Sequence, residues 1–454
     1  MKVRWAMQAA ALALTLVAAT PAAAKVTAAE AARLGAELTP LGATRAGNES
    51  GTIPAWEGGI KEPPPGYRRG EHLVDPFPGD KPLFTITADN FRKYEANLTP
   101  GQIAVIQRYP KTYRMPVYQT RRTASLPPRI YERTIANATT AMLTEDGNGV
   151  VNAAEGVPFP IPKNGLEAVW NHLLRYRGKS ARVTSGQAAP TAAGAYVVVQ
   201  IREQVLWGYQ QPGATTDNID NKLAYFLQEV LSPARLAGTF VLVHETLNQA
   251  AEPRKAWVYN PGQRRVRRAA NVGYDNPGTG SDGQRTNDQA DMYNGAPDRY
   301  DWKLVGKREI YIPYNSYKLA SDRYRYDDIL KPGHVNPDLT RYELHRVWVV
   351  EATLKEGTRH IYPRRTFYLD EDSWQIAVAD QYDARGDIWR VSQSWIVNHY
   401  QVPVLWQTGT AVYDVQNGRY VAKGLTNESE AAEFDVPLER RKFTPQALRR
   451  RGRR

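Results

Sequence analysis

The stretch from residue 341 to residue 399 constrains the fold of this chain more than any other. Large apolar side chains recur there at every second position, which is the period of a β-strand. The turns at 371–373 and 384–387 are short, and short turns join antiparallel neighbours. We therefore predict an antiparallel meander with one aromatic-rich face and one more polar face. Its strands are expected at 341–355, 364–370, 374–378 and 389–397.

The two-residue period begins earlier, at about residue 181, and helical patterns precede it. Residues 256–268 predict a hairpin around a turn at 260–263. Residues 271–299 predict a long polar loop, and loops of this length are usually functional or mobile. Helices are expected at 27–38, after a cap at Asp89, from Thr99-Pro100 onward, and at 165–177.

The region before the strands contains an irregular arm. Residues 40–82 hold eight prolines and eight glycines in 43 residues, a composition that disfavours regular structure. We expect this arm to lie over the folded body. The predicted organisation is a signal peptide at 1–24, an N-terminal helix, arm and covering helices at 25–180, the sheet at 181–425 in the same domain, and a basic tail at 426–454.

The first 24 residues have the composition of an export signal. Lys2 and Arg4 precede an apolar run, and small residues at 22–24 provide a cleavage site between Ala24 and Lys25. The apolar run is shorter than the roughly 18 residues of a spanning helix. The chain has no cysteine, which excludes disulfides, thiolate metal sites and a lipidated N-terminal cysteine. We therefore expect a periplasmic, non-lipidated protein, and association with the outer membrane stays open.

The positive charge is concentrated near the C-terminal end. The formal net charge is +12, and eight basic residues fall within 440–454 without an acidic residue among them. Without this segment and the signal peptide, the body carries only about +2. A nucleic-acid partner is not expected, because such proteins carry their basic surface on the folded body. The tail is expected to be a solvated, disordered end, with contact to anionic lipid headgroups as the alternative.

Motifs that would indicate an enzyme are incomplete. The glycines of 278–283 match a dinucleotide-binding pattern but lie within the polar loop, without a flanking strand and helix. His244-Glu245 begins like a zinc-protease motif, but Asn248 stands where the second histidine is required. The three carboxylates of 370–372 are acid–base candidates, and their place at a hairpin tip favours a solvated turn. We therefore expect no catalytic residues, no metal site and no cofactor.

Four long segments carry a resemblance to a known family. They begin LGAELTPLGATRAGNESG, GVPFPIPKNGLEAVWNHLL, GAPDRYDWKLVGKREIYIPYN and NPDLTRYELHRVWVVEATL, and cover 34–59, 156–178, 295–315 and 336–393. In them the chain resembles a family of uncharacterised, exported bacterial proteins of similar length, a domain-of-unknown-function family related to outer-membrane lipoprotein-sorting proteins. The strings AWVYNPGQRRVRRA at 256–269 and YLDEDSW at 368–374 add a resemblance to periplasmic lipoprotein carriers.

This resemblance implies a fold and a class of function. The fold is mainly β with helices (α+β), a large curved antiparallel sheet in the form of an unclosed half-barrel with helices on its concave side. Carriers of this type bind acyl chains there and catalyse no reaction. The family also accompanies exporters of the resistance–nodulation–division type. That association implies hydrophobic cargo and makes such an exporter and outer-membrane components candidate partners.

The aromatic face of the strands is the candidate site. Helices that fill such a face make it ordinary core, whereas a curved sheet that is only partly covered leaves a cavity for an apolar ligand. Spacing leaves both possibilities open, and the resemblance leads us to predict the cavity. The predicted lining residues are Trp257, Trp348, Val350, Trp374, Ile376 and Trp389.

Three functions are compatible with these observations. We favour a non-enzymatic periplasmic carrier for a hydrophobic, lipid-like or acylated ligand or a lipoprotein, acting in cell-envelope trafficking or export. A periplasmic hydrolase that uses carboxylates is the first alternative, and no complete catalytic set supports it. An outer-membrane β-barrel is the second, and the helical patterns and 31 prolines disfavour it.

Overall fold

The computed structural model describes residues 26–269 and 273–452. The predicted signal peptide at 1–24 lies outside these residues, and so does the cleavage site between Ala24 and Lys25. Within the described residues, one large and mainly antiparallel sheet is accompanied by short helices. This architecture confirms the predicted α+β class.

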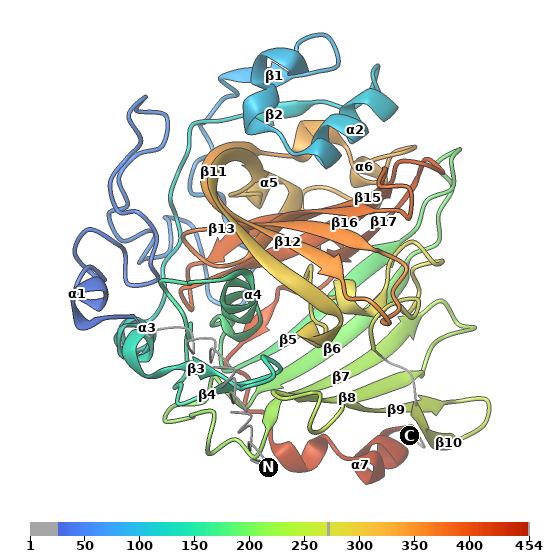
Figure 1. Ribbon diagram of the computed structural model, residues 1–454. Coiled ribbons are helices and arrows are strands. Elements are labelled where there is room, and N and C mark those ends of the chain that lie inside the picture. The colour runs from blue at the N-terminus through green and yellow to red at the C-terminus, as the bar shows by residue number, and fades with distance from the viewer. Residues whose placement is uncertain (1–25, 270–272, 453–454) are drawn as a thin grey trace, which may run out of the picture.

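The predicted meander forms the upper part of the sheet in Figure 1. Each of its strands pairs antiparallel with the next along the chain, as the two-residue period and short turns predicted. A long strand adds to one side of the meander and two more add to the other. The bounds are β11 (Tyr300–Pro313), β12 (Tyr342–Leu354), β13 (Arg364–Asp370), β14 (Ile376–Tyr382), β15 (Ile388–His399), β16 (Val404–Asp414) and β17 (Arg419–Leu425).

The strands that come earlier in the sequence form the lower part of the sheet. They are β5 (Ser180–Ala188), β6 (Val199–Trp207), β7 (Lys222–Ser232), β8 (Phe240–Thr246), β9 (Lys255–Asn260) and β10 (Arg265–Ala269). The β9–β10 pair confirms the predicted hairpin. The two parts meet where β17 pairs with β5, with Ala422 opposite Ala188 and Leu425 opposite Gly186.

Short strands complete the sheet, and it stays unclosed. β1 (Phe84–Ile86) pairs with β2 (Met115–Val117), which adjoins β12. β18 (Glu433–Phe434) adjoins β5, and β3 (Met142–Leu143) pairs separately with β4 (Val150–Val151). The strand order runs from β1 to β10, and these two do not pair with each other. The sheet is therefore curved but open, as the resemblance implied.

The helices are short and lie around the sheet. None of those within 26–269 and 273–452 is long and apolar enough to cross a membrane. The α-helices are α1 (Ala28–Ala31), α2 (Pro100–Arg108), α3 (Pro128–Thr140), α4 (Gly165–Leu174), α5 (Tyr317–Ala320), α6 (Tyr326–Ile329) and α7 (Pro445–Arg451). The 3₁₀ segments are η1 (Phe91–Asn97), η2 (Asn287–Gln289), η3 (Pro297–Arg299), η4 (Pro337–Leu339) and η5 (Arg440–Lys442).

Capping residues explain which predicted helices form. Thr99 caps α2 reciprocally with Gln102, and α4 lies within the predicted range 165–177. The helix expected over 27–38 ends at Ala31 instead. Beyond it, Gly35 adopts a φ of +81°, which a continuing α-helix does not allow. The helix after Asp89 is the 3₁₀ segment η1, and Asn90 precedes it without a side-chain cap.

The meander is covered on both faces, which corrects the prediction of one polar face. Every residue of β14 is buried. On one face, α4 packs against Val350, Phe367 and Ile376. On the other face, α2 and residues 315–340 pack against β15 to β17. Polar side chains on this second face are therefore buried and hydrogen-bonded, and alternation alone does not distinguish them from solvated ones.

Asp380 is one of these buried polar side chains, and it fixes α2 to β14. Its carboxyl accepts hydrogen bonds from the Thr99 hydroxyl at 3.2 Å and the Gly101 amide at 3.1 Å. Burial raises the pKa of Asp380 from 3.8 to about 7, although these two donors act in the opposite direction. Between pH 4 and pH 7 the folded chain therefore keeps a proton that the unfolded chain has released.

Asp380→Asn should become progressively more stable than the wild type as the pH rises. The wild type loses stability as the pH rises from 4 through 7, because the folded state binds more protons than the unfolded state in that range. The amide of the variant does not titrate. Between pH 4 and pH 8, the free energy of unfolding of the variant relative to the wild type should rise by an amount on the order of 4 kcal/mol. Urea denaturation at both pH values measures it, and a pH-independent difference would contradict the assignment.

The C-terminal segment packs on the sheet, which corrects the prediction of a solvated, disordered tail. Phe443 and Leu448 are each only 1% exposed, and they join Leu242 and Tyr259 in a hydrophobic cluster on β8 and β9. In Figure 1, α7 lies along the lower edge of the sheet. Two large apolar side chains suffice to anchor the segment because β8 and β9 present an apolar surface for them to pack against.

Removal of residues 440–454 should therefore destabilise the protein. Phe443→Ala and Leu448→Ala should each cost about 2–5 kcal/mol, because each leaves a cavity in a packed cluster. Arg450→Ala, on the exposed side of α7, should stay within about 0.5 kcal/mol. Denaturant unfolding of the three variants tests this, and equal stability of all three would restore the disordered-tail prediction.

Candidate functional site

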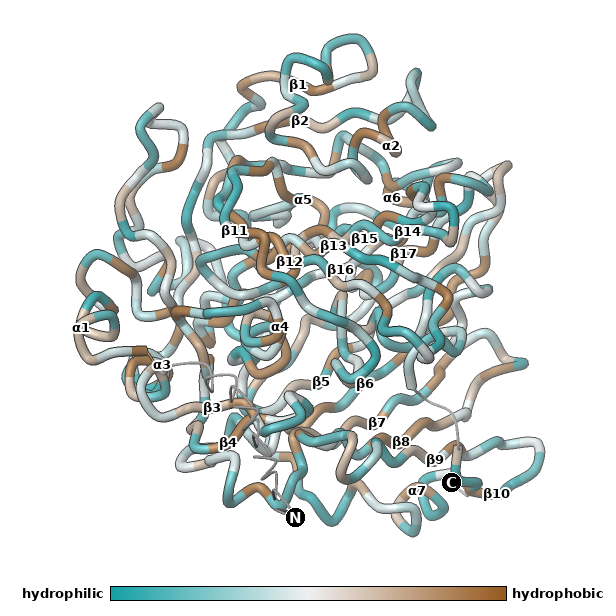
Figure 2. The backbone as a smooth tube through the Cα atoms, in the orientation of Figure 1, coloured by the Kyte–Doolittle hydropathy of each residue, from teal (hydrophilic) through white to brown (hydrophobic). Residues whose placement is uncertain are grey.

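The candidate site lies on the face of β6–β8 that is opposite to α7. Val205 is paired with Phe226, and Phe226 with Val243, across these three strands. Directly opposite residues in an antiparallel pair project from the same face, so the three side chains share one surface. The next residues along the strands, Leu206 and Leu227, project to the other face and contact the tail. Figure 2 shows hydrophobic residues along β7 and β8, which present apolar side chains to both faces.

Residues from 279–294 lie over part of this surface and, together with it, line a partly open cavity of about 190 Å³, which we call the roofed cavity. Thr279, Arg285 and Ala290 are among the residues that the roof contributes to its lining. The strands contribute a mainly apolar wall, formed by Val205, Trp207, Leu223, Ala224, Phe226, Val241 and Val243. Residues 279–294 of the polar loop predicted from the sequence thus cover part of a hollow on the sheet.

Two carboxylates, buried Asp288 and largely buried Asp291, fasten the roof to the sheet and to the end of α4. Asp291 accepts hydrogen bonds from Arg175 and Arg177 at 2.7 and 2.6 Å. Asp288 accepts one from Arg365 at 2.6 Å. Burial alone would favour the neutral acids, but the adjacent guanidinium groups outweigh it and hold the pKa of both carboxyls well below the usual range. The described part of the loop is therefore held in place by charge.

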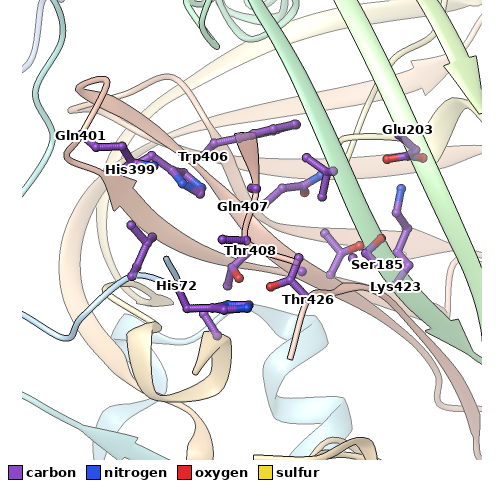
Figure 3. A pocket seen from close by; sticks show the side chains of 18 of the residues that line it. His72, Ser185, Glu203, His399, Gln401, Trp406, Gln407, Thr408, Lys423 and Thr426 are labelled. Atoms are coloured by element: carbon purple, nitrogen blue, oxygen red, sulfur yellow. The ribbon is translucent and has the colours of Figure 1, made fainter. Parts of the chain in front are cut away.

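A second hollow of about 80 Å³, the arm-side hollow, adjoins the roofed cavity. Glu203, Trp406, Gln407 and Lys423 line both. Figure 3 shows Glu203 and Lys423 at one end of the arm-side hollow and His399 and Gln401 at the other. Residues 71–73 of the predicted arm close one side of it.

An interruption in strand pairing creates the arm-side hollow. β17 pairs with β5 at residues 186 and 188, whereas β18 pairs with β5 at residues 181 and 182. The edge of β5 between them lacks a paired strand among the described residues, and Val183 and Ser185 of this gap line the hollow. Thr426, Ala431 and Ala432 line it from the segment that connects β17 to β18.

The predicted lining residues of the meander form packed core. Val350, Trp374 and Ile376 are 0% exposed in the cluster around α4. Trp348 is partly buried and stacks on Trp374, with ring centroids 6.0 Å apart. The structure brings these four together as predicted, but α4 fills the concave face there. This is a correction of the expected open cavity.

The other two predicted residues lie elsewhere. Trp257 is on the α7 side of the sheet, against His244 at 4.8 Å between ring centroids. Trp389 donates its ring N–H to Asp414 at 2.9 Å, away from both hollows. Neither hollow is lined by any of the six residues. The wall of the roofed cavity was missed because only the alternation of Val205 and Trp207 on one strand marks it in the sequence.

The carboxylates of 370–372 are buried, which corrects the prediction of a solvated turn. Asp370, Glu371 and Asp372 are 0%, 2% and 4% exposed. Arg122 donates two hydrogen bonds to Asp372, at 2.7 and 2.9 Å, and Lys307 donates one to Glu371 at 2.7 Å. These ion pairs could not be predicted locally, because their partners come from distant segments.

Arg122 also attaches the arm to the sheet. Its guanidinium donates to the backbone carbonyls of Thr44, Arg45 and Pro54. Residues 40–82 contain no helix or strand, and the three carbonyls that Arg122 holds lie within them. We call the group formed by Arg122 and the carboxylates of 370–372 the arm clamp.

One set of three residues in the described chain has metal-ligand atoms close enough to share an ion. Atoms of His345, Asp370 and Asp372 lie within 4.8 Å of one another. Both oxygens of Asp372 already accept hydrogen bonds from Arg122, so an ion would compete with a guanidinium. His345 is also within 3.1 Å of Glu343. The arrangement suits a structural ion-pair network better than a metal centre.

Arg122→Met should destabilise the protein by about 3–5 kcal/mol, because it leaves buried carboxylates without a counter-charge. The arm should also become more sensitive to proteases, since three of its carbonyls lose their donor. Arg33→Met is the control, because Arg33 and Glu37 form an exposed pair whose loss should cost less than about 1 kcal/mol. Equal stability of the two variants would show that the clamp is not required.

Residues 85–449 match the family described as "Protein of unknown function (DUF1329)". An uncharacterized protein of Pseudomonas aeruginosa is 52% identical over 442 residues, which are 97% of each chain. A solved structure of a putative outer membrane lipoprotein-sorting protein domain from Vibrio parahaemolyticus is similar at 15% identity and a TM-score of 0.43, and the match covers 63% of this chain and 98% of that one. A DUF1329 family protein from Desulfovibrio piger is similar at 16% identity and a TM-score of 0.42, with 60% and 92% covered.

Proposed function

Because the chain belongs to the DUF1329 family of proteins of unknown function, as the resemblance predicted, we propose its function from its own geometry. It is a non-enzymatic carrier that binds a hydrophobic, lipid-like or acylated ligand in the roofed cavity. The proposal places it in the periplasm, on the strength of the predicted signal peptide.

The observation that carries this proposal is a set of apolar side chains left partly exposed inside a hollow that the loop partly covers. Val205, Phe226 and Val241 line the roofed cavity and are each only partly buried. Burial of apolar surface contributes about 25 cal/mol per Å². An apolar ligand that covers these side chains gains this free energy, and the walls and roof already hold them in place.

The alternative of a carboxylate hydrolase receives less support. Of the carboxylates nearest to such a role, Asp372 is engaged by Arg122, and Glu371 by Lys307 and Arg346. Asp370 accepts a hydrogen bond from the Ser373 hydroxyl. A general acid or base must reach its substrate, and these groups are buried beneath the arm. Their geometry supports a structural role.

The proposal extends to surfaces outside the cavity. Arg449 and Arg450 are exposed on α7, while Leu448 holds the helix to the sheet. Because both side chains are cationic and exposed, we include contact with anionic lipid headgroups in the proposal. An exporter of the resistance–nodulation–division type and outer-membrane components remain the proposed partners.

Displacement of a fluorescent fatty acid from the delipidated mature protein tests the carrier function. Unlabelled chains of increasing length should displace it about fourfold better for each added methylene until the cavity is full, because each buried methylene contributes about 0.8 kcal/mol. Affinity that does not depend on chain length, or no binding of any probe, would overturn the proposal.

Matched variants on β7 separate the cavity from the core. Phe226→Gln should weaken binding several-fold and change stability little, because Phe226 faces the hollow. Leu227→Gln, one residue away in the packed cluster beneath α7, should lower stability and leave the affinity of the folded protein unchanged. Trp374→Gln should behave like Leu227→Gln, since Trp374 is core.

A further inference from the structure

We infer that the ligand of the roofed cavity is an anionic amphiphile, with its apolar chain against Val205 and Phe226 and its negative group between Arg285 and Lys423. This inference rests on the proposed carrier function and adds the chemical class of the ligand. It follows from the charges that line the cavity.

The roofed cavity is lined by more cationic than anionic side chains. Most of these charged side chains form ion pairs with each other. Glu245 accepts a hydrogen bond from Arg254 at 2.6 Å. Asp291 accepts one from Arg177 at 2.6 Å and is further bonded outside the lining. Three charged residues of the lining remain, namely Arg285, Lys423 and Glu203.

No two of these three form an ion pair, although the charge of Glu203 partly offsets the lowering of the pKa of Arg285 and of Lys423. Among the described residues, neither Lys423 nor Arg285 has a carboxylate within 4.0 Å, so Glu203 lies beyond ion-pair distance of both. Burial, and then the positive charge of Arg285, lower the pKa of Lys423. Two cations therefore face one carboxylate in a partly desolvated hollow, and a single added negative charge would balance the group.

Arg285 shows most directly that an unpaired cation of this cavity lacks a hydrogen-bond acceptor among the described residues. Arg285 is 9% exposed, and its Nε has no hydrogen-bond partner in the described structure. Its Nη1 donates to the backbone carbonyl of Thr286 at 3.2 Å. A buried guanidinium with an unused donor is costly unless a ligand supplies an acceptor, and a carboxylate or phosphate does so in a fitting geometry.

The position of Lys423 sets the orientation of the ligand. It lines both hollows, with apolar wall on one side and polar side chains on the other. In the arm-side hollow, both ring nitrogens of His399 and the ring N–H of Trp406 are buried without partners among the described residues. An amphiphile with its chain in the roofed cavity therefore has its charge at Lys423 and any further polar headgroup in the arm-side hollow.

A set of twelve-carbon probes tests this inference by calorimetry on the delipidated mature protein. Dodecanoate and dodecyl phosphate should bind about tenfold tighter than dodecanol, and dodecyltrimethylammonium should bind more weakly than dodecanol. The ratio between dodecanoate and dodecyl phosphate distinguishes a carboxylate ligand from a phosphate ligand.

Three variants report on the charge at the junction, by which we mean Glu203 and Lys423, where the two hollows meet. Lys423→Met should remove most of the preference for dodecanoate over dodecanol, and Lys423→Arg should retain that preference. Glu203→Gln should strengthen anion binding, because it removes the competing carboxylate. Arg202→Met is the matched control, since Arg202 neighbours Glu203 on β6, pairs with Glu229 outside the cavity lining, and should have no effect on the ratio.

The outcomes separate the two levels of the proposal. Equal binding of dodecanoate and dodecanol, or an unchanged preference in Lys423→Met, would overturn the anionic class while the carrier function stands. Preference for the trimethylammonium probe would overturn it as well. If no twelve-carbon probe binds the wild type, the carrier function itself fails, and the inference fails with it.

Discussion

Backbone pairing between β5 and β17 joins two parts of the sheet that are far apart in the sequence, and the rest of the structure depends on this seam. It is short and irregular, with its register shifting between Ala422 and Leu425, where Gly424 adopts a φ of +78°. Without it, β5–β10 and β11–β17 would be separate sheets, each with an exposed edge. With it, they form one curved surface with a concave face.

The two parts of this surface are covered in different ways. Over the meander, α4 fills the concave face with side chains, and the result is ordinary core. Over β6–β8, the cover is a loop that is fastened by Asp288 and Asp291 and stands off the wall. A loop held by ion pairs at its anchor points does not need to fill the space beneath it. A hollow therefore remains on one part of the sheet and not on the other.

Local patterns in the sequence predicted local structure well. The meander follows from alternation and short turns, and α2 follows from Thr99, Pro100 and Gln102. Features that depend on distant partners were predicted poorly. The burial of Asp372 depends on Arg122, and the packing of Phe443 depends on a face made by β8 and β9.

The candidate site depends both on a local sequence pattern and on partners that are distant in the sequence. Alternation on β6 is local, but the roofed cavity needs β7 and β8 in register beside it and a roof from residues 279–294. The aromatic residues of the meander were the stronger signal in the sequence. They are large because they fill core against α4, and size alone does not distinguish a filled face from an open one.

The seam also has a consequence for the order in which the chain acquires its structure. The edge of β5 is completed by residues 419–434, so it stays unpaired until nearly the whole chain has been synthesised. Contacts of such long sequence separation form slowly, because the loop between them must first be closed. The junction of Glu203 and Lys423 is thus among the last parts to assemble. A molecule bound across it would hold the two halves together and slow their separation, so cargo and folding would be thermodynamically linked.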